Sequence, residues 1–227
     1  MEFLLDTANR KEIQKLVKEM PFLGITTNPS LVKNEGKIDF FAHMKEIRSI
    51  IGKERSLHIQ VVAPDYEGMI KDAETIIEKI DPEVYIKVPA TKIGLSVMKE
   101  LKRRNVNVTA TAIYTAFQGY LAIASKADYI APYFNRMENL NIAADAVLQE
   151  LADELIRTKS ETKILAASFK NVAQVNCAIK AGVQAVTIDS VILQQAFSMA
   201  SINQAVTDFT MDWETTFGTG TAIHNLT

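Results

Sequence analysis

The sequence has almost no cysteine and little histidine. Cys177 is the only cysteine among 227 residues, which excludes an internal disulfide and a cysteine metal cluster. A zinc site for carbonyl chemistry needs several histidine ligands. The three histidines lie in different predicted settings: His43 in a helix, His58 near the start of a strand and His224 in the C-terminal tail. We therefore predict no catalytic metal and no other cofactor.

An excess of one charge and long apolar runs are also missing. The 25 basic and 27 acidic residues give a formal net charge of −2, which provides no general attraction to nucleic acid or to an anionic membrane. No run reaches the ~18 apolar residues of a membrane-spanning helix. The first residues, Met-Glu-Phe-Leu-Leu-Asp, lack the basic start of a secretion signal. We expect a cytoplasmic protein without nucleic-acid or membrane partners.

Glycine-rich phosphate turns are absent as well. The first strand-like segment runs into Asp6-Thr-Ala-Asn, and the sequence contains neither GxGxxG nor GxxxxGK[ST]. A doubly wound open sheet usually has such a turn after its first strand. This absence favours a closed barrel over an open sheet.

Eight short β-like runs recur along the chain, and each precedes a helical pattern. The predicted strands are 3–6, 24–27, 57–62, 84–88, 107–113, 129–133, 163–167 and 185–188. The predicted helices are about 8–20, 40–51, 65–80, 93–103, 115–125, 141–158, 172–181 and 191–200. This alternation predicts an α/β fold, a (β/α)8 TIM barrel in a single domain over 1–227. An extra amphipathic helix at 202–217 and a flexible or partner-dependent tail at 218–227 follow it.

A lysine interrupts the fourth predicted strand. The two-residue alternation of a strand places Val84, Ile86 and Val88 on one face and Lys87 on the other, directed into the barrel. Burial lowers the pKa of a lysine, and a neutral amine condenses with carbonyl groups. The alternative is a lysine whose stem packs inside while its ammonium reaches solvent. Thr91 follows as the predicted cap of the next helix.

Polar residues cluster at the predicted C-terminal ends of the strands, where substrates bind in this fold. Each has a structural alternative when taken singly: Asp6 or Asn28 as helix caps, for example, and Thr111 as a packing residue. Their convergence on one buried lysine favours function. The set comprises Asp6, Thr26, Thr27, Asn28, Gln60, Lys87, Thr109, Thr111, Tyr133, Arg136, Ser168 and Lys170.

Schiff-base catalysis is the chemistry that this set supports. Lys87 is the predicted nucleophile, and Asp6, the only carboxylate that we place at an inward strand end, is the predicted proton donor and acceptor. Gln60, Thr111 and the Tyr133 hydroxyl are expected to hold a water molecule that transfers a proton. A carboxylate-bound magnesium ion is the metal alternative, which lacks a second inward carboxylate.

A phosphate site is predicted at the ends of the sixth and seventh strands. Arg136, Ser168 and Lys170 combine a guanidinium, a hydroxyl and an ammonium group, which suits a phosphate monoester. Thr26 and Asn28, at the end of the second strand, are further candidate substrate-binding residues. The predicted ligand is therefore a phosphate monoester.

Several motifs together resemble those of the small transaldolase-like enzymes and, within them, the fructose-6-phosphate aldolases. The matching segments span nearly the whole chain: 4–7, 24–30, 60–61, 67–69, 86–89, 111–114, 131–136, 165–170 and 212–213. The resemblance implies a class I aldolase in which Lys87 forms the Schiff base and Asp6, Asn28, Gln60, Thr111 and Tyr133 surround it. It also implies a phosphate site at Arg136 and Ser168, and a ring-shaped homo-oligomer, a pentamer or decamer, assembled through the C-terminal helix.

Two positions help to distinguish the two reactions of this family. Transaldolases resemble one another in having Glu and Phe where this chain has Gln60 and Tyr133, so the aldolase reaction is favoured: reversible cleavage of fructose 6-phosphate to dihydroxyacetone and glyceraldehyde 3-phosphate. Transfer of a dihydroxyacetone unit between sugar phosphates is the alternative, and a non-catalytic sugar-phosphate-binding barrel with Lys87 paired to Asp6 is another. The chain departs from the aldolases at Thr109, an inward position that is apolar in them, and at 137–142, which lacks their glycine pair.

Overall fold

The strands form a closed parallel barrel in the order of the sequence. The computed structural model describes residues 1–226. Its strands are β1 (Glu2–Asp6), β2 (Gly24–Thr26), β3 (Ser56–Gln60), β4 (Tyr85–Pro89), β5 (Val108–Ile113), β6 (Tyr129–Pro132), β7 (Lys163–Ala166) and β8 (Ala185–Ile188). Each strand pairs with its neighbour in the chain, and β8 pairs with β1 to close the barrel. The (β/α)8 fold predicted from the sequence is therefore confirmed.

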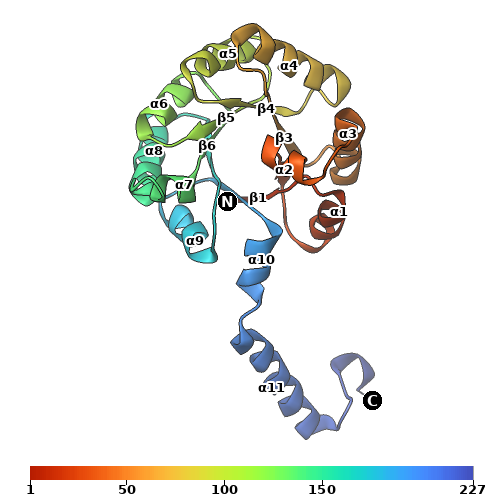
Figure 1. Cartoon of the computed structure of the whole chain (residues 1–227). Coiled ribbons are helices and arrows are strands. Elements are labelled where there is room, and N and C mark those ends of the chain that lie inside the picture. The colour runs from red at the N-terminus through yellow and green to blue at the C-terminus, as the bar shows by residue number, and fades with distance from the viewer. Residues whose placement is uncertain (227) are drawn as a thin grey trace.

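Helices follow the strands, and most of them surround the barrel, as Figure 1 shows. They are α1 (Arg10–Glu19), α2 (Pro29–Asn34), α3 (Phe40–Ile51), α4 (Tyr66–Lys79), α5 (Lys92–Arg103), α6 (Ala116–Ala124), α7 (Phe134–Glu138), α8 (Ala144–Thr158), α9 (Val172–Lys180), α10 (Ser190–Phe197) and α11 (Ala200–Phe217). Within the described residues, no helix is both long and apolar enough to cross a membrane. Short side chains such as Asn9, Asp39 and Asp65 cap the first turns of α1, α3 and α4.

Two short helices depart from the prediction. The helix predicted at 141–158 begins only at Ala144, and a separate helix, α7, lies before it. Asn141 has a positive φ of 57°, a backbone conformation that interrupts a helix. The six-residue helix α2 lies between the strand predicted at 24–27 and the helix predicted at 40–51, where no helix was predicted. Proline occupies its first turn, where the missing N–H costs nothing.

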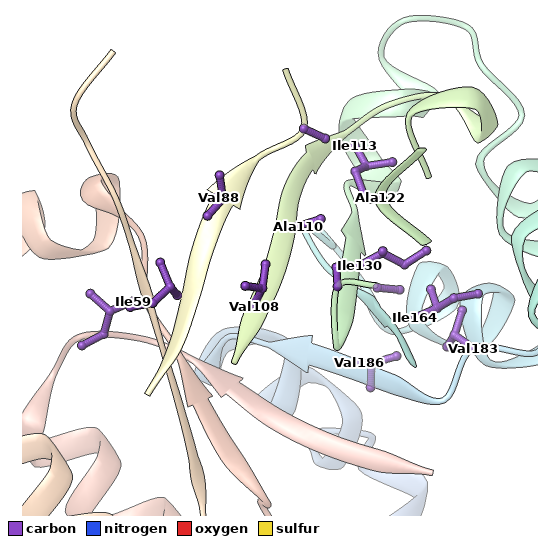
Figure 2. Close-up of a cluster of buried hydrophobic side chains, with 14 of the residues drawn as sticks. Ile59, Val88, Val108, Ala110, Ile113, Ala122, Ile130, Ile164, Val183 and Val186 are labelled. Carbon is purple, nitrogen blue, oxygen red and sulfur yellow. The ribbon is translucent and has the colours of Figure 1, made fainter. Parts of the chain in front are cut away.

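The main core lies between the barrel and its helices. Alternate strand residues point outward and pack against the apolar faces of the helices, as Figure 2 shows for Ile59, Val88, Val108, Ile130 and Val186. A smaller apolar cluster fills the barrel interior and consists of Leu4, Tyr129, Leu165 and Ala185, with Tyr85 packed against it. Polar inward residues replace this apolar filling above it, so the barrel is open to chemistry at the C-terminal ends of its strands.

The connection from β4 to α5 fixes the backbone beside Lys87. The Thr91 side chain accepts a hydrogen bond from the Gly94 N–H at 3.0 Å, so the predicted helix cap is confirmed. A Cβ at position 94 would lie only 1.9 Å from the Pro89 carbonyl oxygen. Glycine therefore allows the first turn of α5 to pack directly on the end of β4.

The C-terminal helix stands away from the barrel (Figure 1). The extra helix predicted at 202–217 is present as α11, and it contains no buried residue. Within the predicted tail at 218–227, Ile223–Asn225 forms a 3-10 helix, and Thr227 lies outside the described residues. The Gly220 N–H donates to a Glu214 carboxylate oxygen at 2.9 Å, which links this segment to the end of α11.

Candidate active site

A cavity of about 410 Å³ lies at the C-terminal ends of the strands. Ten residues were assigned a catalytic or substrate-binding role from the sequence. Nine of them line this cavity: Asp6, Thr26, Asn28, Gln60, Lys87, Tyr133, Arg136, Ser168 and Lys170. The tenth, Thr111, is buried behind the wall and contacts the cavity through Tyr133. The closed barrel therefore brings together side chains that are spread over more than 160 positions of the sequence.

Lys87 is almost completely buried beneath this cavity. Its side chain lies in the barrel interior with 5% of the residue exposed, and its Nζ donates a hydrogen bond to the Thr27 carbonyl oxygen at 2.6 Å. Burial lowers the pKa of the ammonium group, while the negative charge of Asp6 opposes this shift. A larger fraction of Lys87 is therefore neutral, and nucleophilic, than of a lysine in water.

Asp6 ends β1 within a chain of hydroxyl groups. The Thr26 hydroxyl donates to Asp6 Oδ1 at 2.5 Å, and Thr26 Oγ1 lies 2.7 Å from Thr187 Oγ1. Because a hydroxyl carries one hydrogen, a Thr26 that donates to Asp6 accepts its second bond from Thr187. Burial raises the pKa of Asp6, and Lys87 and the Thr26 hydroxyl partly offset that increase. Asp6 is thus poised to exchange a proton.

Asp6 and Lys87 do not form a direct ion pair. The shortest contact of Lys87 Nζ is with the Thr27 carbonyl, and the ion pairs of the described residues do not include one between these two groups. They act on each other through their charges alone, each shifting the pKa of the other toward its ionised form. The direct Asp6–Lys87 pair assumed in the non-catalytic alternative is therefore not formed among the described residues.

Tyr133 and Gln60 provide polar groups on two sides of the cavity. The Tyr133 hydroxyl lies 2.8 Å from Thr111 Oγ1, and burial raises the pKa of Tyr133, so the phenol keeps its proton. Gln60 follows the same register as Lys87 on the neighbouring strand. Within residues 1–226, its buried Oε1 has no hydrogen-bond donor, so it can accept from a water or a substrate hydroxyl.

Cationic groups gather on the side of the cavity formed by β6 and β7. Arg136 lies on α7, donates to the Tyr114 hydroxyl at 3.2 Å and stacks 4.8 Å from the centroid of the Tyr133 ring. Ser168 has a positive φ of 63°, which is uncommon for a residue other than glycine. The exposed Lys170 completes this side of the rim.

Residues 3–226 match the sequence profile of a family described as Transaldolase/Fructose-6-phosphate aldolase. The chain belongs to this family. A protein of Streptococcus pneumoniae (strain ATCC 700669 / Spain 23F-1) named "Probable fructose-6-phosphate aldolase" is 51% identical over 213 residues, which cover 94% of this chain and 96% of that protein. The resemblance inferred from the sequence motifs is thereby confirmed.

A solved structure with low sequence identity to this chain shares only its fold. Thiamine phosphate pyrophosphorylase from Pyrococcus furiosus superposes with a TM-score of 0.59, covering 83% of this chain and 85% of its own, at 12% sequence identity. That identity carries no information about the reaction. The likeness places this transaldolase/fructose-6-phosphate aldolase chain among (β/α)8 barrels, in agreement with its closed strand order.

Asn28 has a structural role in this family member as well as a place in the cavity. Its side-chain oxygen caps α2 by accepting hydrogen bonds from the N–H groups of Ser30 at 3.0 Å and Leu31 at 3.1 Å. The capping role considered for Asn28 from the sequence is therefore confirmed. Its position in the cavity wall places the first turn of α2 beside Gln60.

Two cavity residues were not recognised from the sequence. Thr187, on β8, extends the hydroxyl chain of Asp6, and Asp189 follows the same strand and lines the cavity. The prediction that Asp6 is the only carboxylate at an inward strand end is therefore wrong. The sequence around Asp189 is typical of a helix cap. Asp189 does cap α10, because its carboxylate accepts a hydrogen bond from the Ile192 N–H at 2.8 Å.

Thr109 has a partner that explains its polar side chain in the barrel interior. His58 Nδ1 lies 2.8 Å from Thr109 Oγ1, and His58 Nε2 lies 3.0 Å from Ser56 Oγ. Burial lowers the pKa of His58 well below its ordinary value, and the charges of Lys87 and Arg48 add to this effect. The imidazole is thus neutral and fully hydrogen-bonded, and a polar residue at 109 satisfies it.

The whole arrangement suits carbonyl condensation. It combines a buried amine, a carboxyl group with a raised pKa, a cluster of hydroxyl and amide groups, and a cationic rim. In the described part of the chain, no three histidine, cysteine, aspartate or glutamate side chains lie close enough together to hold a metal ion. A buried amine such as that of Lys87 is able to condense with a ketone.

Proposed function

We propose that this protein is a class I aldolase that reversibly cleaves fructose 6-phosphate to dihydroxyacetone and glyceraldehyde 3-phosphate. The observation that carries the proposal is Lys87, an amine buried at the base of a polar cavity where burial lowers its pKa. No structural purpose accounts for a lysine there, because its single hydrogen bond to the Thr27 carbonyl does not offset the cost of burying a charge. The 51% identical relative supports the substrate by its name.

The first step joins the sugar to the enzyme. The neutral amine of Lys87 attacks the C2 ketone of fructose 6-phosphate, and the resulting carbinolamine loses water to give an iminium ion. Asp6 supplies the proton that leaves with this water, since its raised pKa keeps a proton available. The positive iminium then lies where Lys87 faces the Asp6 charge.

The second step breaks the C3–C4 bond. The C4 hydroxyl loses its proton to Asp6, C4 becomes the aldehyde of glyceraldehyde 3-phosphate, and the bonding electrons pass to the iminium to form an enamine. A water held by Gln60, Thr111 and Tyr133 then protonates the enamine at C3. Hydrolysis of the new iminium releases dihydroxyacetone and restores Lys87.

The phosphate group sets the orientation of the sugar. We place it beside Arg136, Ser168 and Lys170, where the guanidinium and ammonium groups complement its charge. Thr26 and Asn28 line the opposite wall, together with Asp6. This arrangement directs the phosphate away from Asp6 and brings the ketone over Lys87.

The same residues favour the aldolase over the transaldolase reaction. Release of dihydroxyacetone requires a proton for the enamine, and Gln60 with the Tyr133 hydroxyl supplies groups that hold a water for this purpose. A transaldolase instead keeps the enamine until a second aldehyde arrives. The polar pair Gln60 and Tyr133 therefore supports hydrolytic release.

Chemical trapping tests the proposal directly. Incubation with dihydroxyacetone or fructose 6-phosphate, followed by borohydride reduction, is expected to add one reduced three-carbon or six-carbon unit to Lys87, located by peptide mass spectrometry. Lys87→Met should remove the adduct and lower turnover at least about 1000-fold, because covalent catalysis is lost. The exposed Lys92 gives the matched control, Lys92→Met, which should keep both.

The acceptor requirement separates the two family reactions. Turnover of fructose 6-phosphate without an added aldehyde supports the aldolase. Strict dependence on erythrose 4-phosphate would establish transaldolase instead. Binding of the sugar phosphate with no adduct on Lys87 would contradict both and leave a non-catalytic binding barrel.

We further propose that the protein works in the cytoplasm as one domain within a ring-shaped homo-oligomer, a pentamer or decamer. A single cysteine, Cys177, suits the reducing cytoplasm. The oligomer is supported by α11, which exposes Ile202, Val206 and Phe209 to solvent in an isolated chain. Packing of α11 on a neighbouring subunit would cover these side chains.

A further inference from the structure

A second carboxylate stands next to Asp6 at the rim of the barrel. In the pairing of β1 with β8, Leu5 lies opposite Ile188. The residue after each of these two is an aspartate: Asp6 at the end of β1, and Asp189 directly after β8. Both line the same cavity. The closure of the barrel thus places two carboxyl groups at the same height on adjacent strands, although they are separated by almost the whole sequence.

The helix cap does not explain why this residue carries a charge. One carboxylate oxygen of Asp189 accepts a hydrogen bond from the Ile192 N–H at 2.8 Å and caps α10. Asparagine caps a helix about as well as aspartate, because the bond uses a single oxygen. The negative charge of Asp189 is therefore available to act on the cavity.

Several charged or titratable groups face Asp6, from different elements. Lys87 of β4 and the Thr26 hydroxyl of β2 both favour the ionised form of Asp6, whereas Asp189 favours the protonated form. The Tyr133 phenol, whose pKa is raised by burial and also by the charge of Asp6, keeps its own proton. Glu12 of α1, near this edge, is bound by the Thr7 and Ser190 hydroxyls at 2.9 Å each. Of these two carboxylates, Asp189 is the one whose charge raises the pKa of Asp6, against the effect of Lys87.

We propose that Asp189 is a positioning residue whose charge favours the protonated form of Asp6 and so helps Asp6 to recover its proton in each catalytic cycle. This inference rests on the proposed aldolase function. When Lys87 becomes an iminium, its fixed positive charge draws Asp6 toward ionisation, and the nearby carboxylate of Asp189 counteracts this attraction. Asp6 can then release a proton to the departing water and regain one from the C4 hydroxyl.

The variant Asp189→Asn separates charge from capping. It keeps an oxygen for the Ile192 N–H and removes the negative charge. Asp65 offers the matched control, because its carboxylate caps α4 by accepting from the Gly68 N–H at 2.8 Å and it does not line the cavity. Asp65→Asn should therefore leave Asp6 unchanged. Asp189→Ala, which loses cap and charge together, measures the contribution of the cap to the melting temperature.

Two readouts decide the proposal. The first is the titration of Asp6, followed by the carboxyl signals of ¹³C-labelled aspartate in NMR and assigned with Asp6→Asn. Its midpoint should move to lower pH in Asp189→Asn. The second is the pH profile of kcat/KM for fructose 6-phosphate, in which the limb due to Asp6 should move to lower pH by the same amount. The direction is the same whether the active form of Asp6 is protonated or ionised, since either form follows the same titration.

An unchanged Asp6 titration in Asp189→Asn would overturn the proposal, and this result does not depend on any activity. A shifted titration with an unchanged pH profile would also overturn it, because the charge would then play no part in turnover. If the wild-type protein shows no aldolase activity at all, the proposed function fails, and the titration alone still shows whether Asp189 favours the protonated form of Asp6.

Discussion

At the scale of single residues, the barrel interior favours the neutral form of its basic side chains. Burial lowers the pKa of both Lys87 and His58, although the two have different neighbours. His58 is satisfied by Thr109 and Ser56 and stacks on Tyr85 with 4.6 Å between ring centroids. It therefore fills the barrel floor as a neutral group. Lys87 has a single protein hydrogen bond and faces the cavity, which leaves its amine free to react.

Tyr133 allows a sharp test of the proposed water site. Tyr133→Phe removes the hydroxyl that lies 2.8 Å from Thr111 and leaves the ring in contact with Arg136. We expect kcat for fructose 6-phosphate cleavage to fall by roughly 100- to 1000-fold, as general acid–base groups contribute. The borohydride adduct on Lys87 should still form, because the first step does not use Tyr133. Steady-state kinetics and mass spectrometry measure the two effects separately.

A remote tyrosine controls for the loss of a phenol. Tyr120 lies on α6, and its hydroxyl donates to Glu150 at 3.3 Å on the outside of the barrel. Tyr120→Phe should leave kcat unchanged. An unaltered kcat in Tyr133→Phe would show that no proton passes through the water assigned to Tyr133, Thr111 and Gln60.

The sequence alone predicted those cavity residues that lie within a predicted strand or at its end. Lys87 and Gln60 interrupt apolar runs and Asp6 ends one, and strand alternation alone gives their direction. Asp189 directly follows a strand, but its sequence context is equally typical of a helix cap. Its position beside Asp6 results only from the pairing of β8 with β1, which closes the barrel. The pairing of His58 with Thr109 likewise joins two strands that are not adjacent, a relation that no local pattern contains.

At the scale of elements, the eight strands were predicted to within two residues at their ends. The period of the βα units determines them, because each needs an apolar run and an amphipathic helix. The short helix α7 was missed, since five residues directly after a strand are too few to show a helical period. Arg136 owes its position to this helix, so the direction of its guanidinium could not be derived from the sequence.

Gly94 connects helix packing with the position of Lys87. Replacing a helical glycine with alanine ordinarily stabilises a helix by about 1 kcal/mol. Here the new Cβ would lie 1.9 Å from the Pro89 carbonyl oxygen, a backbone atom that cannot rotate away. We expect Gly94→Ala to lower the free energy of unfolding by about 1–3 kcal/mol and to reduce activity by displacing the end of β4. Urea unfolding followed by circular dichroism measures the first effect.

Gly119 is the matched control for this substitution. It also lies within a helix, α6, but a Cβ there would meet the Leu151 side chain at 2.4 Å rather than a backbone carbonyl. Leu151 can change its rotamer, so Gly119→Ala should cost less than Gly94→Ala. Equal destabilisation of the two variants would contradict the requirement for close backbone packing at β4.

At the scale of the whole molecule, the barrel and α11 differ in how they are stabilised. The barrel buries its apolar residues between strands and helices, whereas α11 contains none that is buried. Val206 is 61% exposed and Phe209 is 71% exposed. A helix gains most of its stability from packing an apolar face against a partner. The proposed contact with a neighbouring subunit provides such a partner for both side chains.

Removing the apolar character of α11 tests this assembly. Val206→Glu and Phe209→Glu together place two charges on the exposed apolar surface, and burying them in an interface would cost several kcal/mol. The wild-type chain of 25.2 kDa is expected to elute as a multimer, and the double variant as a monomer, in size-exclusion chromatography with light scattering. Asp208→Glu, on the same helix, preserves charge and should leave the mass of the particle unchanged. A wild-type monomer, or a double variant with an undiminished mass, would refute the role of α11 in assembly.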